Sequence, residues 1–157
     1  MVLILAYGNS LRRDDGAGFA LGDMVERMLS EAGFEVERTD SHQLEPEFAL
    51  DISNDKVSSV LFIDTRIIPQ TPDDGDLRVR FRRVESSKAS PVMGHHLNAS
   101  TLLTYAECLF QKEPRAWLIT VPGIDFDHGE GLSELTRKAI DSAPEILHEL
   151  IGLLRTP

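Results

Sequence analysis

Three polar segments of the sequence contain side chains that could bind a metal ion. Asp14 and Asp15 lie in GNSLRRDDGAG, directly after an apolar run at the start of the chain. Asp64 ends a second apolar run, and His95 and His96 lie in the segment GHHLNAS. Carboxylates and an imidazole form a mixed oxygen and nitrogen ligand set that suits zinc, nickel or a similar divalent ion.

Each of these residues also has a structural role open to it. An aspartate before a helix often caps that helix, so Asp14 or Asp15 could serve as a cap. Asp64 could accept hydrogen bonds from the amides of a neighbouring loop. A single histidine near a helix start is more often a cap or a solvated residue than a ligand. The choice therefore depends on the elements that position these side chains.

Apolar runs along the chain predict five strands. Continuous runs are typical of strands that are buried on both faces, and the sequence has four short strands bounded by turn residues. These predicted strands span Val2–Tyr7, Phe34–Arg38, Ser59–Asp64 and Ala116–Val121. Leu77, Val79 and Phe81 alternate with arginines, which predicts a half-exposed strand at a sheet edge.

Apolar positions at spacings of three and four predict helices between these strands. The predicted helices run from Ala17 to Ala32, from Pro46 to Ile52, from Asn98 to about Gln111, and onward from Ser133. Asn98 and Ser133 are the predicted N-caps, and Pro144 predicts a kink or a break in the last helix. Cys108 falls within the apolar pattern of its helix, so we predict that it is a core residue.

Strands that alternate with helices predict an α/β fold. We expect a three-layer sandwich whose five-stranded, mostly parallel, twisted sheet has helices on both faces and one antiparallel edge strand. The length fits one domain, residues 1–157. In such sheets ligands bind beyond the carboxyl ends of the strands. The polar segments follow predicted strands or precede a helix, so we expect them to meet at that edge.

Composition and motifs exclude several function classes. The net charge of −10 argues against nucleic acid and against an anionic membrane surface as partners. The apolar start of the chain is too short to span a membrane, so we expect a cytoplasmic protein, and the acidic surface favours a monomer. There is no GxSxG motif of the serine hydrolases. Nucleotide binding is disfavoured because Gly8, Gly16 and Gly18 match neither GxGxxG nor the phosphate-loop spacing.

The polar segments together resemble those of a known family. GNSLRRDDGAG after an apolar strand resembles the signature of the nickel–iron hydrogenase maturation proteases. FIDTR resembles the acidic motif on the third strand of that family, and GHHLNASTLL resembles its histidine motif at a helix start. AWLITVPGIDFDHGEGLS resembles its fifth strand and the turn before the final helix. These segments occur in the family's order and cover nearly the whole chain.

The resemblance implies an endopeptidase that removes the C-terminal extension of a hydrogenase large-subunit precursor after nickel insertion. It assigns the two acidic metal contacts, which are also the implied catalytic residues, to Asp15 and Asp64. It assigns the metal-contacting histidine to His95, with His96 as the alternative register. Nickel is carried by the precursor, so we expect no tightly bound cofactor in the chain itself. One departure is the sequence DSHQLEP, where many members have a DGGT-like turn, and it makes His42 an additional polar candidate.

Two other functions are compatible with the same residues. A nickel-sensing chaperone of the hydrogenase precursor would use the same three ligands and would not cut. A general hydrolase with this architecture, acting on peptidyl or aminoacyl substrates, is supported by fold analogy alone. For the protease, two routes of cleavage are open. In one, the metal polarises the scissile carbonyl and Asp15 or Asp64 activates the attacking water. In the other, a carboxylate acts as the base and the metal only positions the peptide.

Overall fold

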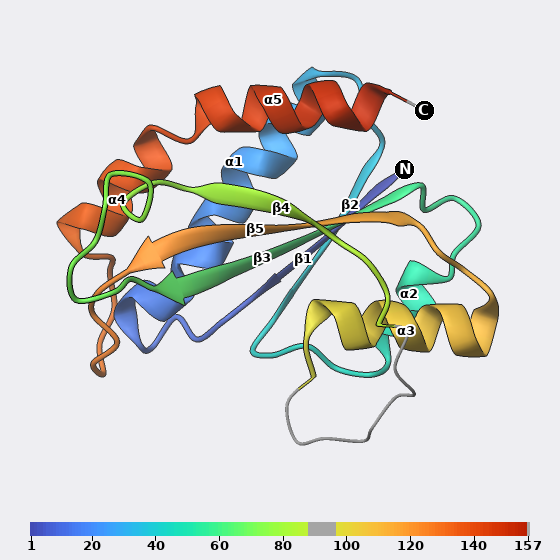
Figure 1. Ribbon diagram of the computed structural model, residues 1–157, viewed down its shortest axis with the longest axis horizontal. Helices are drawn as coiled ribbons and strands as arrows, with labels where there is room; N and C mark the ends of the chain where they lie inside the picture. The colour runs from blue at the N-terminus through green and yellow to red at the C-terminus, as the bar shows by residue number, and fades with distance from the viewer. Residues whose placement is uncertain (88–96, 157) are drawn as a thin grey trace.

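A five-stranded sheet forms the centre of the computed structural model, which describes residues 1–87 and 97–156 (Figure 1). The strands are β1 (Val2–Tyr7), β2 (Val36–Ser41), β3 (Ser59–Ile67), β4 (Arg80–Val84) and β5 (Arg115–Gly123). Their order in the sheet is β2-β1-β3-β5-β4. All neighbouring pairs are parallel except β4 with β5, which is antiparallel. The predicted mostly parallel sheet with one antiparallel edge strand is therefore confirmed.

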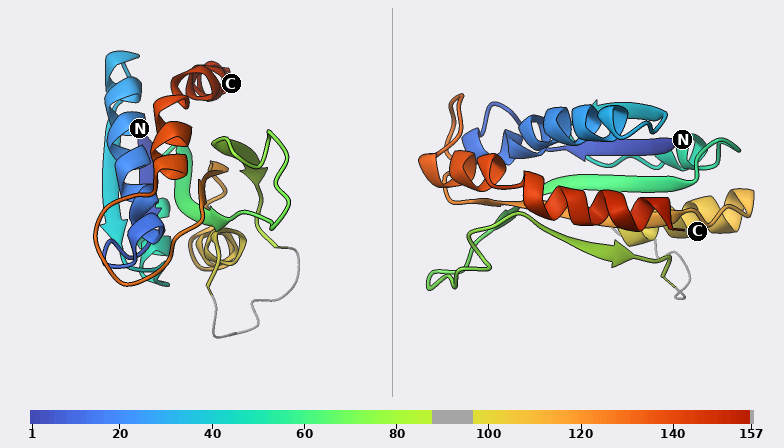
Figure 2. Two further views of the ribbon diagram at one scale, coloured as in Figure 1. Left: turned by 90° about the vertical axis from the view of Figure 1, so that its left-hand side faces the viewer. Right: turned by 90° about the horizontal axis from the view of Figure 1, so that it is seen from above.

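Helices cover both faces of this sheet, as Figures 1 and 2 show. One layer contains α1 (Ala17–Glu31), α4 (Glu134–Asp141) and α5 (Pro144–Arg155), and the other contains α2 (Phe48–Ile52) and α3 (Ala99–Phe110). Successive residues of a strand point to opposite faces. Ile4 of β1 accordingly packs with the first layer, whereas Leu3 and Leu5 pack with the second. This explains why the central strands are apolar at nearly every position.

Every strand after β1 ends later than predicted, and β3 and β5 do so side by side. β3 continues to Ile67 rather than stopping at Asp64, and β5 continues through Pro122 to Gly123. The two strands pair with each other over this extension. β4 pairs with β5 only as far as Thr120, so the side of β5 that faces β4 is unpaired at Pro122. Because proline has no N–H, it fits at this position without the loss of a sheet hydrogen bond. Asp64 consequently lies inside β3, near its carboxyl end.

The prediction that Cys108 is a core residue is wrong, because the cysteine is exposed. The buried residues of α3 lie between Ala99 and Ala106, and Leu109 in the last turn is 68% exposed. The apolar pattern gave the correct face of the helix, but the last turn lies beyond the core that this face covers. The predicted N-cap is confirmed, since the side chain of Asn98 accepts a hydrogen bond from the amide of Thr101.

The end of the chain folds as its local signals predict. Ser133 caps α4 by accepting a hydrogen bond from the amide of Thr136. Pro144 is the first residue of α5, so the predicted break separates two helices. Among residues 1–87 and 97–156, no helix combines the length and the apolar composition that a membrane span requires.

Candidate active site

Asp15 is held in a tight loop that follows β1. The chain leaves β1 at Gly8, forms a short 3-10 helix over Arg13–Gly16 and enters α1 directly. The amide of Asn9 donates a hydrogen bond to Oδ2 of Asp15 at 3.1 Å. A Cβ atom at position 8 would lie 2.0 Å from the carbonyl oxygen of Asp15, so only glycine allows the loop to fold back this closely. Asp15 does not cap α1, because the cap position is Gly16 and no side chain caps it.

Gly8→Ala is therefore expected to lower the free energy of unfolding by about 1–3 kcal/mol, the usual range for a side chain forced into a packed space. The matched control is Gly152→Ala in α5, where a Cβ atom meets no other atom within 4 Å. In a helix interior that change stabilises by about 0.5–1 kcal/mol. Urea unfolding of the three proteins measures both effects. Equal midpoints for Gly8→Ala and the wild type would show that the loop accommodates a methyl group without cost.

Asp64 lies beside Asp15 at the carboxyl end of the sheet. The hydroxyl of Thr65 donates a hydrogen bond of 2.8 Å to the carbonyl oxygen of Asp14, which ties the end of β3 to the loop that carries Asp15. Burial raises the pKa of Asp64 to about 6, and the negative charge of Asp15 adds to this rise. Hydrogen bonds from the Thr65 amide, at 2.7 Å, and from the Tyr7 hydroxyl act in the opposite direction. The fold thus places two carboxylates close enough to repel each other.

Tyr7 is a site residue that the sequence analysis missed. It is the last residue of β1, and the parallel register of β1 and β3 places it next to Asp64. Burial raises the pKa of its phenol, as do the charge of Asp64 and the hydrogen bond to that carboxylate, whereas Arg82 lowers it. Tyr7 therefore stays protonated and donates to Asp64. The available signal was its position, because an aromatic residue with a polar tip ends a strand at the edge where ligands bind.

Asp14, in contrast, is a structural residue. Its side chain is fully buried and accepts hydrogen bonds from the amides of Ile124, Asp125 and Ser133 at 2.9, 3.0 and 2.7 Å. The hydroxyl of Ser133 adds a fourth hydrogen bond at 2.8 Å. Burial acts to raise the pKa of Asp14, but these hydrogen bonds outweigh it and hold the pKa below its usual value. Asp14 thereby fastens the loop after β5 to the loop after β1.

Further contacts join the same two loops. Arg13 donates to the carboxylate of Asp125 at 2.6 Å, and its amide donates to the carbonyl of Gly129 at 3.0 Å. The Arg12 side chain donates to the carbonyl of Phe126 at 3.2 Å. The sequence analysis gave neither arginine a role. Here both help to fix the wall of the site next to Asp15.

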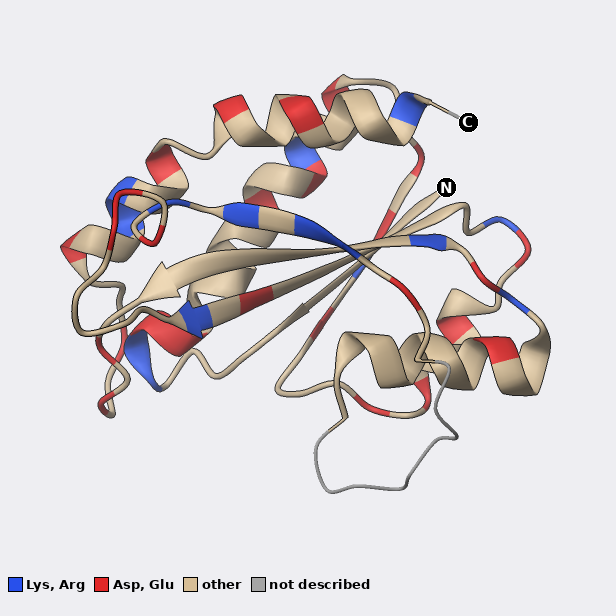
Figure 3. Cartoon of the chain, in the orientation of Figure 1, with Lys and Arg blue, Asp and Glu red and all other residues tan. Residues whose placement is uncertain are grey.

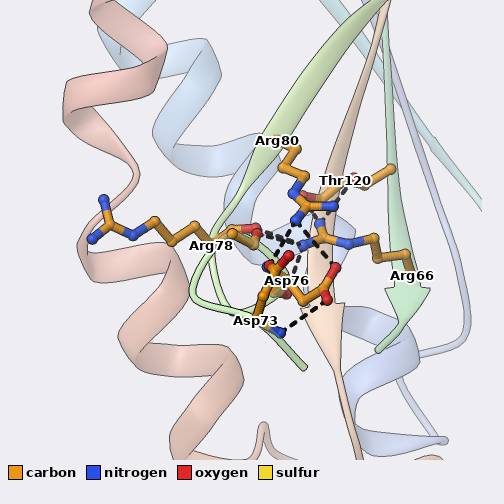
Figure 4. Close-up of polar contacts among 7 residues, drawn as sticks. Arg66, Asp73, Asp76, Arg78, Arg80 and Thr120 are labelled. Atoms are coloured by element: carbon orange, nitrogen blue, oxygen red, sulfur yellow. Dashed lines mark hydrogen bonds and ion pairs between the residues drawn. The ribbon is translucent and has the colours of Figure 1, made fainter. Parts of the chain in front are cut away.

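Arg66 fixes the loop on the other side of Asp64 (Figure 4). Its guanidinium donates to the carbonyl and to the hydroxyl of Thr120, both at 3.1 Å. It also donates to the carbonyls of Asp76 and Arg78 at 2.6 and 2.8 Å. The planar fork of one arginine therefore clamps the connection between β3 and β4 onto β5. Arg66 belongs to the FIDTR segment, but sequence alone did not indicate this role.

Of the three histidines that the sequence analysis named, the structure describes only His42. His95 and His96 lie outside the described residues. His42 is exposed in the loop after β2, whose last residue Ser41 pairs with Tyr7. Within residues 1–87 and 97–156, no group of three or more His, Cys, Asp or Glu side chains is arranged to hold a metal ion. The structure therefore brings Asp15 and Asp64 together, and the third predicted ligand remains a prediction.

Comparison with known proteins adds information about the fold. No protein-family model matches the sequence, and no curated protein sequence matches it. Solved structures do match along nearly the whole chain. The NiFe hydrogenase maturation protease HybD from Thermococcus kodakarensis is 23% identical, with 96% of this chain and 98% of that chain covered and a TM-score of 0.60. The hydrogenase maturating endopeptidase HybD from E. coli is 18% identical, with 98% and 91% covered and a TM-score of 0.63.

A third solved structure is similar to the same extent. The NiFe hydrogenase maturation protease HycI from Thermococcus kodakarensis is 16% identical, with 99% of this chain and 92% of that chain covered and a TM-score of 0.65. The chain therefore has the fold of these maturation proteases, as the resemblance of its motifs implied.

Proposed function

We propose that the chain is an endopeptidase that removes the C-terminal extension of a nickel–iron hydrogenase large-subunit precursor after nickel insertion. The observation that supports this most directly is the carboxylate pair Asp15 and Asp64 at the ligand-binding edge of a fold shared with maturation proteases. The four sequence segments that resemble the family's motifs support the same assignment.

The chemistry of the carboxylate pair fits a divalent cation that arrives with the substrate. Asp64 has a pKa of about 6, in part because of the charge of Asp15, and no described cation neutralises either carboxylate through an ion pair. A bound cation removes the repulsion between the two groups and favours the ionised form of Asp64. Asp15, Asp64 and His95 are the proposed contacts to nickel in the precursor. Cleavage then depends on whether nickel is present.

Peptide hydrolysis requires a base for the attacking water. Asp15 or Asp64 takes the proton of that water in one route, while substrate nickel polarises the scissile carbonyl. In the other route the carboxylate is still the base and nickel only positions the peptide. Tyr7 holds Asp64 in place in both routes by donating its hydroxyl hydrogen.

The experiment that tests this function is incubation with a nickel-loaded and a nickel-free large-subunit precursor, followed by intact-mass measurement. We expect loss of a short C-terminal peptide from the loaded precursor only. Asp51→Asn, which changes an exposed carboxylate in α2, is the control that should process normally. Binding of loaded precursor without a change in mass would replace the protease by the chaperone. Equal cleavage of both precursors would remove the dependence on nickel.

A further inference from the structure

The edge strand β4 presents an open side with many arginines. β4 is the last strand of the sheet and pairs only with β5 among the described strands. The segment RVRFRR over residues 78–83 has four arginines and no acidic residue, in a chain whose net charge is −10. These arginines appear as blue stretches on and just before β4 (Figure 3). An open edge has unpaired backbone donors and acceptors that can bind an additional strand.

Most of this positive charge has no acidic partner. Arg80 contacts the carboxylates of Asp73 and Asp76 at 3.4 and 3.1 Å. Arg78, Arg82 and Arg83 are exposed and form no ion pair with any residue in the described ranges. In a strongly acidic protein, local carboxylates would be expected to neutralise such a strand, but among residues 1–87 and 97–156 they pair with Arg80 alone.

Arg82 and Arg83 lie on opposite faces of the sheet, and Arg83 is held by an aromatic contact. The guanidinium of Arg83 lies 4.8 Å from the centre of the Trp117 ring, which stacks it over β5. Arg82 points to the other face of the sheet, the face of Val84, Phe62 and Asp64, because side chains alternate along each strand. Arg82 therefore lies on the same face of the sheet as Asp64, with β5 between their two strands.

We propose that the open edge of β4, with Arg82 and Arg83, docks an extended acidic segment of the protein substrate as an added strand. This inference rests on the proposed function, because it assigns the docking segment to the same precursor. Backbone hydrogen bonds of the edge supply affinity, and the two guanidinium groups select carboxylate side chains.

The sheet spacing predicts where this segment lies in the substrate. From β3 to a strand added beside β4 there are three strand spacings, about 14 Å at roughly 4.8 Å each. An extended chain covers that distance in about four residues at roughly 3.3 Å per residue. The acidic segment should therefore begin about four residues or more from the cleaved bond. If the arginines served only to prevent edge-to-edge aggregation, they would not favour a substrate with an acidic segment at this distance from the cleaved bond.

The test uses a fluorescent peptide of repeated Val-Glu-Glu, whose adjacent glutamates point to both faces of the sheet, and the full chain carrying Asp64→Asn so that nothing is cleaved. We expect Arg82→Glu with Arg83→Glu to weaken binding at least about tenfold, as expected for losing charge-assisted contacts. The matched control is Arg27→Glu with Arg137→Glu, which makes the same charge change at exposed helical positions and should stay within about twofold. Arg82→Gln, which leaves the contact of Arg83 with Trp117 intact, replaces the double variant if that variant does not fold.

One further peptide and an oligonucleotide separate the possible outcomes. An analogue with every backbone nitrogen of the peptide methylated keeps its charge but cannot donate to a sheet edge from either side, and we expect it to bind at least about tenfold more weakly. Any one of three results would overturn the proposal. These are equal binding of the two peptides, equal loss of peptide binding in the two double variants, and tighter binding of a single-stranded oligonucleotide than of the acidic peptide. Because this assay involves neither nickel nor cleavage, its result is independent of whether the precursor is processed.

Discussion

Asp64→Asn is expected to abolish precursor processing and, at the same time, to stabilise the fold at neutral pH. The loss of activity should reach about a thousandfold, within the usual range for removing an acid–base group. The gain in stability follows from the pKa of Asp64, which burial raises from 3.8 to about 6. At about 1.36 kcal/mol per pH unit, ionised Asp64 opposes folding by roughly 3 kcal/mol.

The sign of this effect sets its pH dependence. In the unfolded chain Asp64 loses its proton near pH 3.8, whereas in the folded chain it does so near pH 6. The cost is therefore fully present above pH 6, decreases as the pH falls toward 4 and is absent below that. Urea unfolding should show the variant to be more stable than the wild type at pH 7.5, with the difference nearly gone at pH 4. A difference that does not change with pH would mean that Asp64 is not a desolvated charge.

Asp14→Ala is expected to have the largest effect on stability, a loss of about 3–5 kcal/mol. The variant leaves three backbone amides and the hydroxyl of Ser133 without their shared acceptor. Each buried donor without a partner costs about 1–3 kcal/mol, and some of these donors will reach water. Asp127→Ala, which removes an exposed carboxylate in the loop after β5, should change stability by no more than about 0.5 kcal/mol.

The pH dependence of this second effect is opposite to that of Asp64. The pKa of Asp14 is lowered in the folded state, so its stabilising contribution is present at neutral pH and is lost as the pH falls through that lowered value. The wild type should therefore lose stability in acid more steeply than Asp14→Ala. If that variant does not fold, Asp14→Asn keeps one acceptor oxygen and should show an intermediate loss. Wild-type stability in either variant would contradict the structural role of Asp14.

The parts of the fold that depend on local signals could be predicted from the sequence. Continuous apolar runs marked β1 and β3, and the caps Asn98 and Ser133 act within one helical turn of their partners. Cys108 shows the limit of helical periodicity, because the pattern defines a face but not the point where the core beneath it ends. The ends of β3 and β5 escaped prediction for a similar reason, since each strand is extended by pairing with the other.

The candidate site was predictable in part for the same reasons. Asp15 and Asp64 follow from the rule that polar residues at strand ends meet at one edge, and the hydrogen bond between their neighbours Thr65 and Asp14 joins the two segments there. The role of Asp14 was not predictable, because its partners lie 110 to 119 residues away in the sequence. Whether an aspartate binds a metal or fastens a loop depends on contacts that no local pattern contains.

The long separation between Asp14 and its partners has a consequence for how the protein forms during synthesis. The ribosome makes Ile124 110 residues after Asp14, and Ser133 119 residues after it. Until then the carboxylate has none of the donors that hold it in the folded state, and the loop that carries Asp15 stays unfastened. The loop that carries Asp15 is therefore not fully fastened until synthesis has passed residue 133.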